Sequence, residues 1–297
     1  MTQSTGASFA PTPYGELNGV LAHLLDGARE VLKDNFLGAY LQGSFAVGDY
    51  TPWSDCDFII VTHRDITLDE LPALQRLHAA IHELPAPYWR NGLEGSYAPK
   101  DILRRWSPTP RDPPGEARPE GWLDPGMEGH SARAYPFWYL DHGSKTLVRS
   151  EHDNSWVVRW CLRERGVTLA GPPPHTLIDP IPVDELRREV RATMGRCLEA
   201  GLEPMHLVAW QAFWVGLFCR ILHTLACGEV TSKPKAMIWA GQTLDPQWSG
   251  LIAAARAMKK GDPAESARPA DPFAVTQTQA FADYAAAWAD ARFPDAR

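Results

Sequence analysis

One stretch, GSFAVGDYTPWSDCDFIIV at residues 43–61, constrains the fold of this chain more than any other feature. The stretch runs into CDFIIVT, residues 56–62, which has the β-branched, apolar character that is typical of a strand in the centre of a sheet. Asp55 and Asp57 stand at the start of that strand, and alternate residues of a strand point to the same face. The two carboxylates are therefore expected side by side, where they offer the hard oxygen ligands that Mg²⁺ prefers.

The residues before this strand fit phosphate chemistry. Backbone N–H groups at the Gly43-Ser44 turn, together with the Ser44 hydroxyl, are suited to hold the phosphates of a nucleotide. Metal ions held by the two aspartates would neutralise charge on the phosphate under attack and on a leaving pyrophosphate. A D-x-D alone is a weak signal because surface turns often contain it. The uninterrupted order of turn, D-x-D and apolar strand favours the metal site.

The flanking segments predict an α/β domain that contains this strand. Residues 15–33 have helical spacing, and LGAYLQGS then switches to a short strand that ends at the Gly-Ser turn. Residues 68–84 predict the helix after CDFIIVT. The segment NGLEGSYA shows a weak alternation of apolar and polar residues, which is consistent with a further strand. This order of strands and helices indicates a mixed sheet flanked by helices.

The second half of the chain lacks strand signals. Residues 105–135 are too rich in Pro and Gly for a regular element and predict a loop or insertion, after which NSWVVRWCLRERG is helical. Beyond the linker AGPPPHTLIDPIP all segments have helical periodicity, which predicts a bundle. The expected class is α+β, with an N-terminal domain over residues 1–178 that includes the insertion and a helical domain over residues 179–297.

Composition excludes several function classes. The 297 residues are 44% hydrophobic and carry a net charge of -7 without a long Lys/Arg cluster, so the footprint of a nucleic-acid binder is missing and a small cationic substrate fits better. The five cysteines show neither CxxC pairing nor zinc-ligand spacing, which fits reduced thiols. No P-loop, HExxH or GxSxG motif is present.

We expect a cytoplasmic protein without a membrane span, and we expect it to be a monomer. The first residues lack the basic start and apolar core of a signal peptide. Residues 207–226 approach the length that spans a membrane, but they contain four polar or charged residues, Gln211, Arg220, His223 and Thr224. We therefore expect this run to be the central helix of the bundle and expect no membrane association.

The order of Gly43-Ser44, Asp55-Cys56-Asp57 and FIIV resembles the nucleotidyltransferase superfamily with the DNA polymerase β type of palm. Most of the chain resembles the aminoglycoside nucleotidyltransferases of the streptomycin and spectinomycin 3''-(9)-adenylyltransferase type. Later anchors of this resemblance are GVTLAGPPPHTLIDPIP, residues 166–182, and RILHTLACGEVTSKPKAMIWA, residues 220–240. The resemblance implies a nucleotidyltransferase domain, a C-terminal helical domain and an active site between them.

The resemblance also implies site residues and cofactors. It assigns metal binding to Asp55 and Asp57, and it assigns the catalytic base, which also counts as a metal ligand, to Glu94 on a following antiparallel strand. ATP is the implied co-substrate, with Mg²⁺, expected as two ions, as the cofactor. One glycine, two serines and two basic residues would contact the nucleotide, namely Gly43, Ser44, Ser54, Arg220 and Lys233.

The acceptor site departs from the pattern of that family. The resemblance places an Asp ahead of the nucleotide-binding Arg in streptomycin-modifying members. Trp210 stands at that spacing here, and its presence favours spectinomycin over streptomycin as the substrate. Three aromatic residues and one carboxylate are candidates for an acceptor pocket that meets an amino sugar or aminocyclitol, namely Trp122, Trp138, Tyr139 and Asp141. His142 and His152 are too far apart in sequence to predict a metal pair.

These observations predict an enzyme that transfers AMP from ATP to a hydroxyl of an aminoglycoside or aminocyclitol antibiotic and releases pyrophosphate. Alternatives are the same chemistry on a non-antibiotic metabolite or a protein hydroxyl, and a non-catalytic nucleotide-binding homologue. The three carboxylates Asp55, Asp57 and Glu94 favour an enzyme over the last alternative. The acidic net charge disfavours a polynucleotide acceptor.

Overall fold

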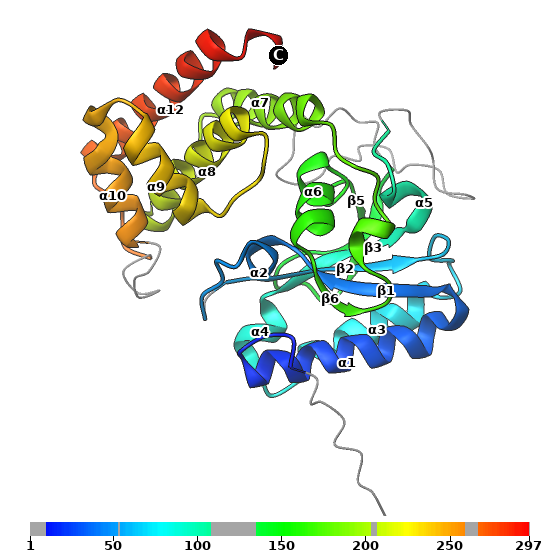
Figure 1. Ribbon diagram of the computed structural model, residues 1–297. Coiled ribbons are helices and arrows are strands. Elements are labelled where there is room, and N and C mark those ends of the chain that lie inside the picture. Colours follow the sequence, from blue (N-terminus) through cyan, green and yellow to red (C-terminus); the bar gives the residue numbers. More distant parts are fainter. Residues whose placement is uncertain (1–9, 53, 108–134, 203–206, 259–266, 297) are drawn as a thin grey trace, which may run out of the picture. The chain divides into compact units, whose positions relative to one another are not determined.

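The computed structural model describes residues 10–52, 54–107, 135–202, 207–258 and 267–296, and the chain divides into two compact units (Figure 1). The described part of the first unit lies within Met1–Ala46, Ser54–Asn154 and Leu162–Asp179. The described part of the second lies within Val47–Trp53, Ser155–Cys161 and Pro180–Arg297. The predicted α+β class is confirmed, because a mixed sheet flanked by helices precedes a helical region.

The first unit contains the sheet and the helices that connect its strands. In chain order the elements up to residue 180 are α1 (Gly15–Leu32), η1 (Lys33–Asn35), β1 (Phe36–Leu41), α2 (Gly43–Val47), β2 (Cys56–Thr62), α3 (Leu71–His82), α4 (Pro87–Asn91), β3 (Leu93–Pro99), α5 (Lys100–Leu103), β4 (Phe137–Leu140), β5 (Leu147–Ser150), α6 (Trp156–Arg165), β6 (Val167–Ala170) and η2 (Pro174–Thr176). The residues that form α6 are shared between the two units, with the first turns in the second unit.

The described strands form one sheet in the order β5-β4-β3-β2-β1-β6. β2 and β3 are parallel, and every other neighbouring pair is antiparallel. The expectation that Glu94 lies on a strand antiparallel to β2 is therefore wrong. The helices α3 and α4 return the chain to the end of the sheet at which β2 begins, so that β3 runs in the same direction as β2.

One face of the sheet packs against α1 and α3 (Figure 1). Phe58 and Ile60 of β2 are buried in this core together with Leu21 of α1 and Leu74 of α3. Full burial of such side chains stabilises the fold by roughly 1.5–3 kcal/mol each. Because β2 alternates about this core, Asp57 points to the other face of the sheet.

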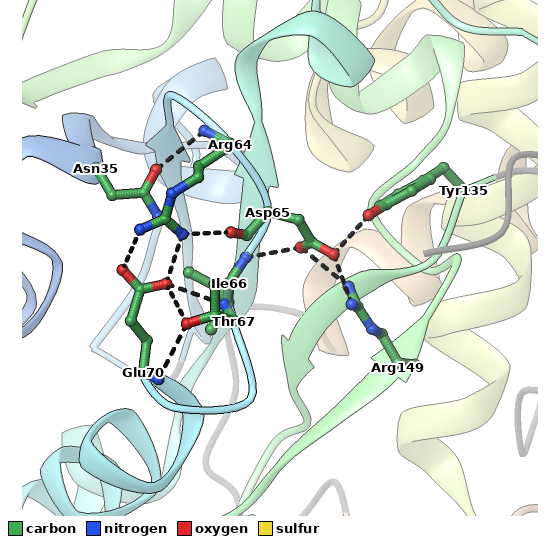
Figure 2. A network of polar contacts seen from close by, with 8 residues as sticks. All are labelled: Asn35, Arg64, Asp65, Ile66, Thr67, Glu70, Tyr135 and Arg149. Atoms are coloured by element: carbon green, nitrogen blue, oxygen red, sulfur yellow. Dashed lines mark hydrogen bonds and ion pairs between the residues drawn. The ribbon is translucent and has the colours of Figure 1, made fainter. Parts of the chain in front are cut away.

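A polar network lies just after the end of β2, around Asp65 (Figure 2). Asp55 and Asp57 are at the opposite end of this strand. The carboxylate of Asp65 accepts two hydrogen bonds from the Arg149 guanidinium on β5, at 3.1 and 2.6 Å, and one from the Tyr135 hydroxyl at 2.5 Å. Arg149 also lies 4.3 Å from the ring centre of Trp138 on β4. This largely buried, bidentate ion pair ties the edge hairpin to the centre of the sheet.

The second unit is helical throughout its described elements. These are α7 (Val183–Glu199), α8 (Val208–Cys227), α9 (Lys233–Thr243), η3 (Pro246–Trp248), α10 (Ser249–Met258), α12 (Pro272–Arg292) and η4 (Pro294–Ala296). α8 ends at Gly228, which adopts the left-handed conformation that favours glycine. α8 contacts α7, α9, α10 and α12, so it is the central helix of this unit, as its composition predicts.

Among the described residues, α8 is one helix with the length and composition to cross a membrane. However, 67% of its most apolar window is buried within the protein, which is the condition of a core helix. Its polar residues fit that environment, since Gln211 is buried and accepts a 2.5 Å hydrogen bond from the Thr278 hydroxyl on α12. His223 and Thr224 are also buried.

Candidate active site

The three predicted carboxylates lie together at the start of the two parallel strands. In the β2–β3 register Asp57 is directly opposite Glu94, and Asp55 precedes Asp57 by two residues. Side chains that are paired across a sheet, or two residues apart along an extended chain, share a face. The parallel crossover thus brings Glu94 beside the D-x-D, so the sequence prediction and the geometry agree on these neighbours.

Gly43 is required by its contact with one of these carboxylates. Its φ of 56° is in the left-handed region, and a Cβ at this position would lie 1.9 Å from Oδ2 of Asp57. Only glycine fits both the backbone conformation and the space. The Ser44 hydroxyl donates a hydrogen bond of 3.4 Å to the main-chain carbonyl of Asp55, which links the Gly-Ser turn to the D-x-D. Ser54 is half-buried in the loop before β2.

Glu94 is held at one of its two oxygens. The Tyr139 hydroxyl, from the neighbouring strand β4, donates a hydrogen bond of 2.5 Å to Oε1 of Glu94. The imidazole of His152 lies 3.3 Å from the same oxygen and stacks on the Tyr139 ring, with ring centres 4.9 Å apart. A carboxylate restrained in this way has a defined orientation toward the other acidic side chains.

Asp153 is a fourth carboxylate close to this cluster. It is buried and accepts a 2.9 Å hydrogen bond from the Gln42 amide and a 2.6 Å hydrogen bond from the Ser96 hydroxyl. Ser96 is two residues after Glu94 on β3, and Gln42 directly follows β1. Two central strands thus anchor a negative charge beside the site.

The concentration of carboxylates changes their acidity. Burial, with the neighbouring charges of Glu94, Asp153 and Asp55, raises the pKa of Asp57 to about 7, although His152 opposes the shift. Burial likewise raises the pKa of Glu94 above its usual range, against the lowering effect of the Tyr139 hydrogen bond and His152. A raised carboxyl pKa means that the ionised form is poorly compensated, and a nearby cation would stabilise it.

The donor set fits a divalent metal ion. Asp55, Glu94 and His142 each offer one ligand atom, and these atoms lie within 4.8 Å of one another. Carboxylate oxygens are the ligands that Mg²⁺ and Mn²⁺ take, and a dication would relieve the repulsion that raises the pKa of Asp57. The Asp57 carboxylate lies deeper, against Gly43.

Of the predicted acceptor residues that the structure describes, Tyr139 and Asp141 are in contact, and Trp138 points away from them. Tyr139 faces Glu94, whereas Trp138, the residue before it on β4, faces the core with α1 and α3 and lies under the Arg149 guanidinium. Adjacent residues of a strand point to opposite faces, so these two cannot line one pocket. Asp141 accepts hydrogen bonds from Tyr139 and from the His142 backbone. Trp122 lies outside the described residues.

The two basic residues that the resemblance assigns to the nucleotide belong to the second unit. Lys233 is the first residue of α9, and its Nζ lies 4.0 Å from the ring centre of Phe213 on α8. Its stem packs against Gly216, where an added Cβ would approach the Lys233 side chain to 3.3 Å. Arg220 is half-buried on α8, one helical turn after Gly216.

Sequence reasoning missed four side chains of the carboxylate site. His142 contacts Asp55 at 3.0 Å, and the others, His152, Asp153 and Gln42, contact the cluster as described above. The two histidines and Asp153 reach the site through strand pairing, because β4 pairs with β3 and β5 pairs with β4. Gln42 comes from the end of β1, which pairs with β2. One sequence feature could have indicated both histidines. His142 precedes the short strand segment LVRS and His152 follows it, so the two lie on either side of this strand.

Comparison with protein families gives a match for each half of the chain. A model described as "Nucleotidyltransferase domain" matches residues 25–104, which include Gly43, Asp55, Asp57 and Glu94. A second model, described as "Aminoglycoside adenylyltransferase, C-terminal domain", matches residues 176–287 and thus most of the helical unit. The chain belongs to the aminoglycoside nucleotidyltransferase family. This family membership makes the protein a transferase.

One solved structure has a similar fold. It is the crystal structure of spectinomycin adenyltransferase AAD(9) from Enterococcus faecialis with ATP and spectinomycin. The match has a TM-score of 0.62 and covers 91% of this chain and 98% of that chain, at 13% sequence identity. No curated protein matches the chain. At this identity the likeness concerns the fold.

Proposed function

We propose that the protein transfers AMP from ATP to a hydroxyl of an aminoglycoside or aminocyclitol antibiotic, with spectinomycin favoured over streptomycin. The observation that carries this proposal is the pairing of Asp57 with Glu94 on parallel strands, with a carboxylate oxygen of Asp55 within 4.8 Å of one of Glu94. A nucleotidyl transfer requires carboxylates for a metal-bound nucleotide and a base for the attacking hydroxyl. This arrangement supplies both within one cluster.

The carboxylates have two roles in this reaction, metal binding and proton transfer. Asp55, Asp57 and Glu94 would hold Mg²⁺, which when bound supplies positive charge beside the α-phosphate and the leaving pyrophosphate. Glu94 accepts the proton of the acceptor hydroxyl while the oxygen of that hydroxyl forms a bond to the α-phosphorus. The bond from that phosphorus to the bridging oxygen breaks, and pyrophosphate leaves with the electron pair. A carboxylate whose pKa is raised by burial is a better base than one in water.

The acceptor class rests on charge and on one substitution. The net charge of -7 and the acidic cluster favour a small cationic acceptor. Trp210 on α8 occupies the position at which the resemblance places an Asp in streptomycin-modifying members. Without that carboxylate, a cationic group of streptomycin loses a partner. The AAD(9) structure of similar fold contains spectinomycin, which supports the same preference.

The nucleotide contacts extend the proposal to the second unit. Arg220 and Lys233 would bind ATP phosphates, with Lys233 oriented by the ring of Phe213. Gly43, Ser44 and Ser54 would contact the phosphates from the first unit.

We propose that the protein acts as a cytoplasmic monomer.

The test is pyrophosphate release from ATP and Mg²⁺ by purified protein, with spectinomycin, streptomycin and further aminoglycosides as acceptors. We expect turnover with spectinomycin, loss of turnover in Glu94→Gln, and no loss in Glu30→Gln, which changes an exposed carboxylate on α1. Mass spectrometry of the product should show addition of one AMP group.

A susceptibility panel provides the matching cellular result. A sensitive host that expresses wild-type protein should be protected against spectinomycin, and a host that expresses Glu94→Gln should not be. If no antibiotic is turned over while a metabolite or a protein in a lysate acquires AMP, the acceptor class is wrong and the chemistry stands. If ATP binds without metal dependence and nothing is modified, the protein is a non-catalytic homologue.

A further inference from the structure

His142 is held against the carboxylate site by a tight turn. It follows β4 in a turn in which the backbone N–H of Ser144 donates to the carbonyl of Asp141 at 2.9 Å. The backbone N–H of His142 donates to the Asp141 carboxylate, also at 2.9 Å, and Gly143 takes a left-handed φ of 73°. Since β4 pairs with β3, this turn lies beside the strand that carries Glu94.

The imidazole has the spacing of a metal ligand. Its Nδ1 lies 3.0 Å from Oδ1 of Asp55. His142, Asp55 and Glu94 each offer one ligand atom, and these three atoms lie within 4.8 Å of one another. Ligands of an octahedral ion at 2.0–2.1 Å from the metal lie about 3 Å apart when they are neighbours. The nitrogen and the oxygen are thus already separated as two adjacent ligands of one ion.

We propose that Nδ1 of His142 is a ligand of the divalent metal ion held by Asp55 and Glu94, and that it shifts the site toward Mn²⁺ relative to Mg²⁺. This inference rests on the proposed function, because it concerns the metal ion of the same site. Imidazole suits transition metals, whereas Mg²⁺ takes oxygen ligands, so one nitrogen changes the relative affinity for the two ions. An ordinary surface ion pair between His142 and Asp55 would have no such effect.

The direct test is electron spin-echo spectroscopy of the full-length protein with Mn²⁺ and inorganic pyrophosphate, a product that contains no nitrogen. A directly bound imidazole nitrogen modulates the Mn²⁺ echo. We expect this modulation in wild type and in His63→Ala, an exposed histidine just after β2, and its loss in His142→Ala. Modulation that survives in His142→Ala, or disappears only in His152→Ala, overturns the assignment.

Metal titrations provide the second readout. In His142→Ala we expect the Mn²⁺ affinity to fall about tenfold and the Mg²⁺ affinity to change much less. His142→Asp should retain metal binding without nitrogen modulation, and its ratio of Mn²⁺ to Mg²⁺ affinity should fall. An equal loss for both ions in His142→Ala overturns the inference.

The proposed function and this inference fail in different ways. If wild type binds Mn²⁺ without nitrogen modulation and still transfers AMP, the role of His142 is wrong and the function stands. If neither ion binds with pyrophosphate, both the ligand assignment and the metal-dependent reaction are wrong. Asp55→Asn serves as the reference for loss of the site, because it removes the oxygen nearest to Nδ1 of His142.

Discussion

The Tyr139 hydroxyl donates a hydrogen bond of 2.5 Å to Oε1 of Glu94, from β4 to the adjacent strand β3. His152 contacts the same oxygen at 3.3 Å. Because these described partners meet at Oε1, we expect Oε2 to be the oxygen that takes the proton of the acceptor hydroxyl. Tyr139 is thus a positioning residue for the base.

Replacing Tyr139 by Phe removes this hydrogen bond and keeps the ring that stacks on His152. We expect kcat to fall about tenfold, which corresponds to the lower range for a hydrogen bond to a charged group. KM for ATP should change less than twofold, because Glu94 acts on the acceptor. Steady-state kinetics of AMP transfer would measure both quantities.

Tyr135→Phe is the matched control for this prediction. It removes a tyrosine hydrogen bond of the same length to a carboxylate, but the acceptor is Asp65 at the other end of β2 (Figure 2). This variant should lose some thermal stability with kcat unchanged. A similar fall of kcat in both variants would mean that Tyr139 acts through general stability and does not orient Glu94.

Gly43→Ala should abolish most activity, because the new Cβ cannot coexist with the Asp57 carboxylate in its present place. A displacement of about 1 Å at a catalytic group can reduce the rate about a hundredfold. Gly48→Ala is the control, since its φ of 70° is also left-handed but no described atom lies within 4 Å of its added Cβ. Both variants bear about 1–2 kcal/mol of backbone strain, visible as a lower Tm, and only Gly43→Ala should be inactive.

Lys233→Ala tests the contribution of the helical unit to ATP binding. We expect KM for ATP to rise about tenfold, because an ammonium group that contacts a phosphate is worth about 1.4 kcal/mol or more. Lys235→Ala, two residues later on α9 and exposed, should leave KM unchanged. Equal values of KM for the two variants would exclude Lys233 from the nucleotide site.

Stability should depend on pH through His78, which is buried against Phe58 and within 2.9 Å of the Tyr97 hydroxyl. Burial lowers its pKa from 6.5 to about 3. Between these values the unfolded chain binds a proton that the folded protein does not, so the free energy of unfolding decreases as the pH falls below 6.5.

His78→Gln removes this titration and retains a polar group for Tyr97. Between pH 7.5 and pH 5.5, wild type should lose about 1.4 kcal/mol more unfolding free energy than the variant. Urea unfolding at the two pH values measures this difference. Parallel pH dependence in the two proteins would show that His78 accepts a proton in the folded state.

The sequence predicted the centre of the site because its signals are local. The order of Gly43, Asp55 and Asp57 before an apolar strand predicted a carboxylate pair beside a tight turn. In the structure the turn residue Gly43 packs directly against the Asp57 carboxylate. The central helix of the bundle was also predictable, since α8 is apolar on nearly all sides. In both cases the determining residues lie within one continuous segment.

The remaining neighbours depend on strand pairing between distant segments. The direction of β3 follows from the crossover through α3 and α4, which the alternation of NGLEGSYA does not encode. His142 and His152 reach the site only because the β4–β5 hairpin pairs with β3. Trp138 and Tyr139 are adjacent in sequence, but they point to opposite faces of β4, and only Tyr139 faces Glu94.

The strand β6 closes the sheet at β1, with Ala170 opposite Ala39, after the chain has already formed the first turns of α6 in the helical unit. During synthesis β1 therefore leaves the ribosome long before its edge partner, and its backbone groups on that side stay unpaired in the meantime. A nascent or truncated chain that ends at Asn154 presents this open edge to other chains and is prone to aggregate. Fragments intended to fold independently should extend past Asp179.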